Sequence, residues 1–424
     1  MDSNNSRANS QAGNMECTPG NQIEPLERYR FGGYYSIYIN DRCGPGYRYT
    51  IVHKLGFGKH STVWLAHDEI EDCYVALKIE MASREKNSME RSILHNLSND
   101  LRGTNHHVLT MMESFLIQGR NGTHQCLVLR PGLCDLPRVH SNVKGPSLFK
   151  LSVARSIVAQ LIRTTALLHS LDIVHGGIHP SNILFKLLHR STQLAETIYM
   201  SYGQPEKKKV SREDTSDFAR APRYLVYPVL PRKACEDLTP DDANIMLADF
   251  GESWKPIRNT RYELCAPFFY RPPEAMFAKT EQRAINEAAD IWMLGCTIYA
   301  IFSSGDDLFG GDCADEDATL ANNISALGKP PLTWWKMWKG RDEFFDVHGN
   351  WNANHPRISY DGFYSLEKRV SYIRQYRGDD FSDEEMADLL AMLESMLKWQ
   401  PRERISAAKL LNGKWMKKWG AGAD

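Results

Sequence analysis

The stretch LGFGKHSTVWLAHDEIEDCYVALKIE, residues 55–80, decides the fold. Apolar and polar residues alternate on both sides of the GFGKH turn, which predicts a β-hairpin followed by a third strand. Gly56 and Gly58 let the backbone bend tightly and approach phosphate oxygens closely. Ser61 stands where a third glycine is common, so an ordinary hairpin with glycine turns is the better explanation of the stretch taken alone. The strand that follows carries VALK with Lys78, which strengthens the phosphate-binding interpretation.

Lys78 lies in the third strand between apolar neighbours, so it is either exposed at an edge or directed into a cleft. A helix is predicted over residues 87–97, where Glu90 shares the apolar stripe of Leu94 and Leu97. A buried carboxylate requires a cation, because an unpaired buried charge is costly. We therefore predict a Lys78–Glu90 ion pair, with two unrelated surface charges as the alternative.

The stretch NIMLADFGESW, residues 244–254, ends an apolar run on Asp249 before a Phe-Gly turn. Such an aspartate is either a turn cap or a ligand at a strand end that faces a cleft. Asn182 lies in the sequence just beyond another loop. Together the two side chains predict an oxygen-ligand site for Mg²⁺.

A small β-rich part precedes a large helical part, which predicts an α+β fold of two lobes with a cleft between them. A further buried strand is expected at residues 124–133, and helices are expected at residues 148–171, 289–304 and 386–399. The predicted division is a disordered tail at 1–26, an N-lobe at 27–132 and a C-lobe at 133–424 that includes an insertion at 186–245.

Composition excludes several classes of protein. The net charge of −1 argues against nucleic acid and acidic membranes as direct partners. Nine cysteines without a CxxC pair indicate free thiols in a reducing compartment. We find no signal peptide core and no apolar run near the roughly 18 residues of a membrane span. We therefore expect a cytoplasmic or nuclear protein, and a monomer.

Taken together, these motifs resemble the eukaryotic protein kinases, and specifically the fungal SR-protein kinase (SRPK) group. The hallmarks in order are LGFGKHSTVWLA, VALK, the helix glutamate, DFG, YRPPEAMF, DIWMLGCTIYA and PRERISAAKLL. The resemblance covers the chain from about residue 27 to its end. ERYRFGGYYSIYINDR, the Ser at position 61, the long insertion and LGKPPLTWW are similar to that subgroup.

The resemblance implies that ATP and Mg²⁺ bind in the cleft. Lys78, held by Glu90, would neutralise the phosphates, and Asn182 and Asp249 would hold the metal. The residues implied to surround the nucleotide are Leu55, Gly56, Gly58, Val63, Ala76 and Leu184. The resemblance also implies a buried spine of Leu94, His175 and Phe250 linked to Asp290, and a structural ion pair between Glu274 and Arg404.

The loop HGGIHPSN, residues 175–182, departs from the kinase pattern. Gly177 replaces the aspartate that orients the attacking hydroxyl, His179 replaces a lysine, and Pro267 replaces a threonine that commonly binds both groups. A positioned base supplies on the order of 10² to 10⁴ in rate, so its loss leaves a slow enzyme rather than necessarily a dead one. His179 is a candidate substitute base.

The expected activity is therefore transfer of the ATP γ-phosphate to serine in basic, Arg/Ser-rich proteins at a reduced rate. The alternatives are a pseudokinase, which binds nucleotide as a scaffold, and an adaptor that has lost ATP as well. The acidic clusters 306–307 and 315–317 attract Arg-rich tails in one interpretation and are solvated loops in the other. No arginine stands directly before Gly177, so the usual clamp for a phosphorylated activation loop is absent. The segment 249–274 is short and carries Thr260 as its only threonine, so control by phosphorylation there is not expected.

Overall fold

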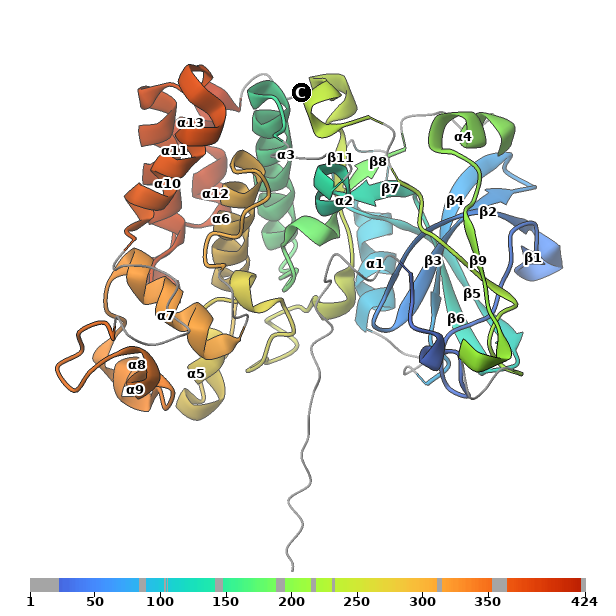
Figure 1. Ribbon diagram of the computed structural model, residues 1–424, viewed down its shortest axis with the longest axis horizontal. Coiled ribbons are helices and arrows are strands. Elements are labelled where there is room, and N and C mark those ends of the chain that lie inside the picture. Colours follow the sequence, from blue (N-terminus) through green and yellow to red (C-terminus); the bar gives the residue numbers. More distant parts are fainter. Residues whose placement is uncertain are drawn as a thin grey trace, which may run out of the picture.

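The chain folds into two lobes, one built around a β-sheet and one built from helices (Figure 1). In this computed structural model the sheet lobe lies to the right of the view and the helical lobe to the left. The structure describes residues 23–83, 89–102, 104, 106–141, 148–187, 195–214, 219–230, 233–310, 315–352 and 364–420. The predicted α+β fold with a β-rich N-lobe and a helical C-lobe is confirmed.

The N-lobe contains a six-stranded antiparallel sheet in the order β1-β2-β3-β4-β6-β5. Its strands are β1 (Arg42–Cys43), β2 (Tyr49–Gly58), β3 (Ser61–Asp68), β4 (Cys73–Glu80), β5 (Met111–Gly119) and β6 (Gly122–Leu129). The predicted hairpin and third strand are confirmed, since Gly58 pairs with Ser61 and Val63 pairs with Lys78. The strand predicted at 124–133 is β6, which ends before Pro131.

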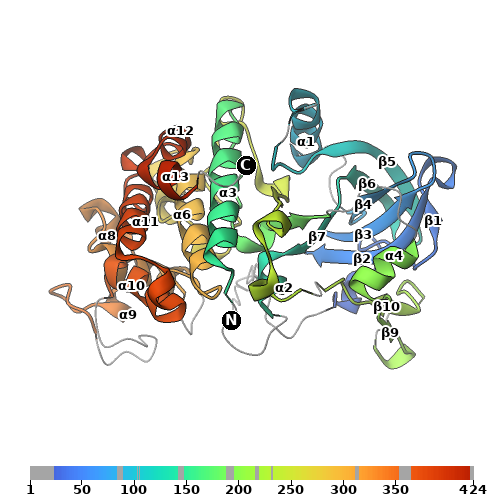
Figure 2. The ribbon, with the colours of Figure 1, turned by 90° about the horizontal axis from the view of Figure 1, so that it is seen from above.

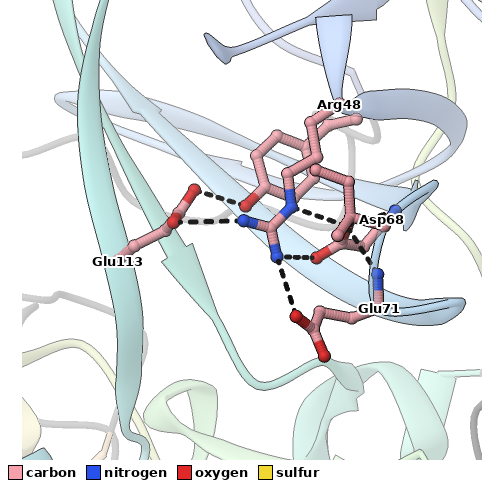
Figure 3. A network of polar contacts seen from close by, with 6 residues as sticks. Arg48, Asp68, Glu71 and Glu113 are labelled. Atoms are coloured by element: carbon pink, nitrogen blue, oxygen red, sulfur yellow. Dashed lines mark hydrogen bonds and ion pairs between the residues drawn. The ribbon is translucent and has the colours of Figure 1, made fainter. Parts of the chain in front are cut away.

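A network around Arg48 shows that this sheet curls (Figure 3). The Arg48 guanidinium binds Asp68 at the end of β3 through two hydrogen bonds of 2.7 and 2.6 Å. It also lies 3.4 Å from Glu113 on β5. Arg48 directly precedes β2, the neighbour of the edge strand β1, whereas β5 is the strand at the opposite edge of the sheet. The Tyr49 ring stacks on Phe115 of β5, with 5.7 Å between centroids. The two ends of the sheet therefore approach each other.

The face of the N-lobe next to the C-lobe carries α1 (Met89–Asp100), which buries Glu90, Ile93, Leu94 and Leu97. The predicted helix is confirmed from Met89 onward, while residues 87 and 88 lie outside the described residues. A three-stranded sheet in the order β11-β8-β7 joins the lobes. Its strands are β7 (Gly132–Asp135), β8 (Ile183–Lys186) and β11 (Ile245–Leu247).

The C-lobe is a helical bundle in which α6 lies between α3 and α11 (Figure 2). Most side chains of α6 are buried. The helices of the C-lobe are α2 (Leu136–Ser141), α3 (Leu151–Ser170), α5 (Glu274–Glu281), α6 (Ala288–Phe302), α7 (Glu316–Leu327), α8 (Leu332–Met337), α9 (Arg341–Phe344), α10 (Leu366–Arg377), α11 (Asp383–Met396), α12 (Ala407–Leu411) and α13 (Lys414–Trp419). The three predicted C-lobe helices correspond to α3, α6 and α11 and are confirmed.

Helix α3 corrects the expectation that the chain contains no apolar stretch near the length of a membrane span. By length and composition alone it is long and apolar enough to cross a membrane, with a mean hydropathy of 1.2 over its most apolar window. However, 67% of that window is buried inside the protein, and α3 packs against α6, α12 and β11. A buried core helix of a globular lobe meets the same criteria, and this packing favours that interpretation.

The outer face of the N-lobe sheet is covered by two segments that lie far apart in the sequence. The N-terminal segment, residues 23–40, contributes Ile37 to the core cluster on that face, and the predicted insertion contributes Val226. Figures 1 and 2 place α4 (Ala195–Tyr202), β9 (Lys207–Lys209) and β10 (Tyr224–Val226) of the insertion beside the N-lobe strands. The end of the insertion contacts the C-lobe instead, where Gln160 of α3 donates a hydrogen bond to the Ala243 carbonyl.

The N-terminal segment also changes where the folded part of the chain begins. Of the predicted disordered tail, residues 1–22 lie outside the described residues. Residues 23–26 belong to the folded N-lobe instead, because Glu24 is buried and its carboxylate accepts a hydrogen bond of 2.6 Å from the Tyr29 hydroxyl. The prediction of a disordered tail is therefore wrong for residues 23–26, in which Glu24 is bound by Tyr29 and Lys54 of the N-lobe.

Candidate functional site

Three charged side chains from separate elements meet between the lobes. The Lys78 ammonium on β4 lies 2.5 Å from a carboxylate oxygen of Glu90 on α1 and 2.9 Å from a carboxylate oxygen of Asp249, just after β11. The predicted Lys78–Glu90 ion pair is therefore present. Glu90 is fully buried, whereas the Asp249 side chain is 56% exposed. The buried carboxylate fixes the lysine, and the exposed one remains accessible to a ligand.

The charges of this group support one another. Burial lowers the pKa of Lys78, but the charges of Asp249 and Glu90 outweigh burial and raise that pKa above its usual value. The positive charge of Lys78 in turn holds the pKa of Asp249 well below its usual range. Lys78 is therefore a cation and Asp249 an anion throughout the physiological pH range.

Asn182 and Asp249 lie at the ends of two paired strands of the sheet that joins the lobes, on the same side of that sheet's strand pair. Strand β8 begins after Asn182 and β11 ends just before Asp249, and Ile183 pairs with Leu247 in antiparallel register. The Ala248 amide donates a hydrogen bond of 2.8 Å to the Asn182 carbonyl, which brings the two segments together. Asp249 adopts φ 62°, the left-handed region that aspartate tolerates better than most residues.

The side-chain oxygens of Asn182 and Asp249 suit a hard cation such as Mg²⁺. The side-chain amide nitrogen of Asn182 donates to the Gly177 carbonyl at 2.8 Å and contacts His179 Nε2 at 3.1 Å, which leaves its oxygen for a metal. Asp249 binds Lys78 through Oδ1, which leaves Oδ2. Mg²⁺ is usually held by one or two protein oxygens plus substrate phosphates. Within the described residues no three His, Cys, Asp or Glu side chains form a group that could hold a metal ion.

The residues predicted to surround a nucleotide lie on the strands that border this group. Val63 on β3 pairs with Gly56 on β2, and Ala76 on β4 pairs with Leu65. Leu184 on β8 packs over Gly132, where an added Cβ would approach it to 2.8 Å. The apolar members Leu55, Val63, Ala76 and Leu184 belong to, or pack against, one core cluster that spans both lobes.

The predicted spine is held by Asp290 on α6. Its carboxylate accepts backbone hydrogen bonds of 2.8 Å from both His175 and Gly176. The His175 ring lies edge to face with Phe250, 4.8 Å between centroids, and contacts the Ala248 carbonyl at 3.1 Å. Leu94 lies in the same core cluster as Phe250. The loop that begins at His175 is therefore tied to both the helical core and the Asp249 turn.

The same loop carries the departure from the kinase pattern. Gly177 is buried, and a Cβ added there would lie 3.3 Å from the Asn182 amide nitrogen and 3.7 Å from His175 Nδ1. His179 Nε2 is engaged with the Asn182 amide rather than directed at an open position. Burial lowers the pKa of His179 to about 4, against the attraction of Asp249. His179 is therefore neutral at pH 7 but too weakly basic to be an efficient substitute base.

The depressed pKa of His179 predicts how stability depends on pH. An unfolded histidine titrates near about 6.5, so between roughly pH 6.5 and 4 the unfolded state binds a proton that the folded state excludes. His179 therefore lowers the free energy of unfolding as the pH falls through this window. In urea denaturation at several pH values, His179→Gln should reduce this slope by up to about 1.4 kcal/mol per pH unit. The exposed His95→Gln is the control, and an equal change in both variants would contradict the assignment.

The acidic clusters considered as an attraction for Arg-rich tails are largely engaged within the C-lobe. Asp307 accepts a hydrogen bond from the Tyr270 hydroxyl, and Glu316 lies 3.2 Å from Arg271. Asp315 caps α7, and Asp317 accepts a hydrogen bond of 2.6 Å from the Trp338 indole. These contacts favour a structural role for the clusters.

Several contacts to the backbone of the glycine-rich loop were not predicted from the sequence. Arg138 of α2 donates a hydrogen bond of 2.7 Å to the Leu55 carbonyl, across the two lobes. The Tyr34 hydroxyl donates one of 2.5 Å to the Gly58 carbonyl, and Arg28 donates to the Lys59 carbonyl. Because all three acceptors are main-chain carbonyls, no pattern of loop side chains could have indicated the partners.

Comparison with known proteins agrees with this geometry. The family model described as "Protein kinase domain" matches residues 49–222 and 237–416. A serine/threonine protein kinase of Aspergillus fumigatus is 28% identical over 403 residues, which cover 93% of this chain and 90% of that protein. A serine/threonine-protein kinase named SRPK, from Physarum polycephalum, is 28% identical over 411 residues, 93% of this chain and 91% of that protein. Protein kinase dsk1 of Schizosaccharomyces pombe is 31% identical over 170 residues, 38% of this chain and 30% of that protein.

Proposed function

The chain belongs to the protein kinase family, and on that premise we propose that it binds Mg-ATP between its lobes and transfers the γ-phosphate to serine at a reduced rate. The observation that carries the proposal is the convergence of Lys78, Glu90 and Asp249 on one point. Each comes from a different element, so no local structural need explains why they meet. A cation beside an exposed carboxylate is what a metal-bound polyphosphate requires.

The roles of the residues follow from their contacts. Lys78 uses two of its three donors on carboxylates and keeps one for a phosphate oxygen. Asn182 and Asp249 would hold Mg²⁺, which would neutralise charge on the phosphates. The remaining catalysis would come from positioning and electrostatic stabilisation, which dominate phosphoryl transfer. Without a carboxylate at Gly177, we expect the rate to be lower by about 10² to 10⁴ than with a positioned base.

Two measurements test this proposal separately. Thermal unfolding with and without Mg-ATP tests binding, since a ligand at 100 times its Kd stabilises the folded state by about 2.7 kcal/mol. Transfer of radiolabelled phosphate to an Arg-Ser peptide tests the reaction. Stabilisation with transfer supports a slow kinase, and stabilisation without transfer supports the pseudokinase. The absence of stabilisation would favour an adaptor that no longer binds nucleotide.

Replacing Lys78 with methionine should abolish both the Mg-ATP stabilisation and any transfer. The variant removes the phosphate-binding cation and deprives the buried Glu90 of the Lys78 charge, so the nucleotide-free protein should also lose stability. The quantity to compare is therefore the increase in melting temperature on adding Mg-ATP.

The matched control for this variant is Arg155→Met. It breaks another pair with a buried carboxylate, that of Glu385 in the C-lobe, where the closest contact is 2.5 Å. This variant should be destabilised but should keep the full nucleotide response. Transfer that persisted in Lys78→Met would indicate a contaminating kinase, and a nucleotide response that persisted would refute the assigned site.

The pseudokinase is the second candidate, and one observation favours it. His179, the nearest candidate base, has a lowered pKa and is bound to Asn182. A nucleotide-responsive scaffold needs the Lys78 group but no base. The same transfer assay decides between the two, because the scaffold predicts stabilisation by Mg-ATP with no labelled product.

The proposal extends to the substrates of the protein and to its location in the cell. One relative carries the name SRPK, which is the support for Arg/Ser-rich protein substrates. The seven cysteines within the described residues are free thiols, which suits the reducing cytoplasm or nucleus. We propose that the protein acts there as a monomer on basic protein substrates. Phosphorylation of an Arg-Ser peptide but not of its Lys-Ser analogue would support this specificity.

A further inference from the structure

The glycine-rich loop between β2 and β3 is held from the face of the sheet opposite the cleft. On β3 and β4, Trp64 pairs with Leu77 and Val63 pairs with Lys78. Successive side chains of a strand point to opposite faces, so the first pair lies on the outer face and the second on the cleft face. Trp64 and Leu77 share a core cluster with Ile37 of the N-terminal segment. This segment therefore lies against the outer face.

Two side chains of the N-terminal segment bind consecutive carbonyls at the tip of the loop. The Tyr34 hydroxyl donates to Gly58 at 2.5 Å, and Arg28 donates to Lys59. Tyr34 is buried, and its ring packs edge to face on Tyr29 with 5.5 Å between centroids. Burial also raises the pKa of Tyr34 to about 12, so the hydroxyl remains a donor at neutral pH.

Because the peptide bond is planar, these contacts also indicate the direction in which the N–H groups of the loop point. In a trans peptide the carbonyl of one residue and the N–H of the next point in opposite directions. If the Gly58 and Lys59 carbonyls are drawn toward the outer segment, the N–H groups of Lys59 and His60 face away from it. That direction is the side of Val63 and Lys78. Successive N–H groups on one side of a turn form a cradle for anions.

The N-terminal segment also binds strand β2, which leads into the loop. Glu24 of the segment forms an ion pair with Lys54 of β2, and both side chains are almost completely buried. The Lys54 ammonium also lies 5.2 Å from the centre of the Trp64 ring. From the insertion, the Val229 amide donates to the Lys54 carbonyl at 2.8 Å. The N-terminal segment thus contacts both strand β2 and the tip of the loop that follows it.

We propose that Tyr34 and Arg28 are positioning residues that hold the loop amides ready for the terminal phosphates of a nucleoside triphosphate. The inference rests on the proposed nucleotide binding and adds to it a function for the N-terminal segment. Neither side chain touches the nucleotide, because both lie on the far side of the loop. Their removal should therefore weaken triphosphate binding selectively and leave the binding of adenosine unchanged.

The test compares Tyr34→Phe with Tyr35→Phe. Both changes remove one hydroxyl from neighbouring tyrosines, but Tyr35 packs against Gly119 and His124, away from the loop. Titration calorimetry should give about a five- to tenfold higher Kd of Tyr34→Phe for Mg-ATP, the effect of losing one hydrogen bond, and an unchanged Kd for adenosine. Arg28→Met should act in the same direction, and Tyr35→Phe should match the parent protein for both ligands.

Hydrogen exchange of the nucleotide-free protein gives a second measurement that does not depend on the ligand. Backbone amides of residues 56–62 should exchange faster in Tyr34→Phe and Arg28→Met than in Tyr35→Phe. Equal losses of ATP and adenosine affinity would indicate a general structural role and overturn the inference. Unchanged affinity and exchange would also overturn it. If the parent protein bound no nucleotide, the proposed function would fail, while the exchange experiment would still decide whether the loop is held from outside.

Discussion

Arg404→Met is expected to lower the free energy of unfolding by about 3–5 kcal/mol, since it leaves a buried carboxylate without its cation. The Arg404 guanidinium binds both oxygens of Glu274, at 2.7 and 2.5 Å, and its side chain is fully buried. It also donates to the backbone carbonyls of Ala288 and Lys398 and lies 5.0 Å from the Trp292 ring. One side chain thus connects α5, α6 and the turn before α12.

The double variant Glu274→Met, Arg404→Met separates charge from packing. A buried pair replaced on both sides by apolar residues is often nearly neutral, so the double variant should recover much of the stability lost in Arg404→Met. Urea denaturation followed by tryptophan fluorescence measures both. A double variant as unstable as the single one would show that the loss comes from the carbonyl contacts. The stabilisation by Mg-ATP should remain in the folded protein, because the pair lies in the C-lobe away from Lys78.

The elements with one buried face were predictable from the sequence. Helix α1 shows its buried stripe as Ile93, Leu94 and Leu97, and Glu90 lies on the same stripe, which is why its pairing with Lys78 could be inferred. Strand β5 was not predicted because Met112 and Leu116 on its outward face are exposed although apolar, so polar and apolar residues do not alternate along it.

The parts that could not be predicted depend on contacts between distant segments. Strand β9 is a run of three exposed lysines and has no apolar face, and it forms only because β10 pairs with it. The cover of the N-lobe by Ile37 and Val226 joins residues almost two hundred positions apart in the chain. Likewise, the sequence offers His179 as a base, but only the fold shows that it is half-buried and that its Nε2 is bound to Asn182.

Gly177→Asp is expected to raise the rate of phosphoryl transfer by about 10² to 10⁴, the contribution of a positioned base. The backbone permits the change, because Gly177 does not need a left-handed conformation. An added Cβ would lie 3.3 Å from the Asn182 amide nitrogen, so that amide must move by a few tenths of an ångström. The new carboxylate would sit on a loop that Asp290 already holds through the amides of His175 and Gly176.

Gly177→Asn is the matched control, because it has the same size and can hydrogen-bond to the attacking hydroxyl but cannot serve as a base near pH 7. Single-turnover transfer to an Arg-Ser peptide at saturating Mg-ATP measures both variants against the parent protein. A gain confined to the aspartate identifies the missing base as the defect. Equal gains in both variants would mean that orientation of the hydroxyl was lacking. No gain in either, with the Mg-ATP stabilisation intact, would place the defect at His179 and Pro267 and support the scaffold.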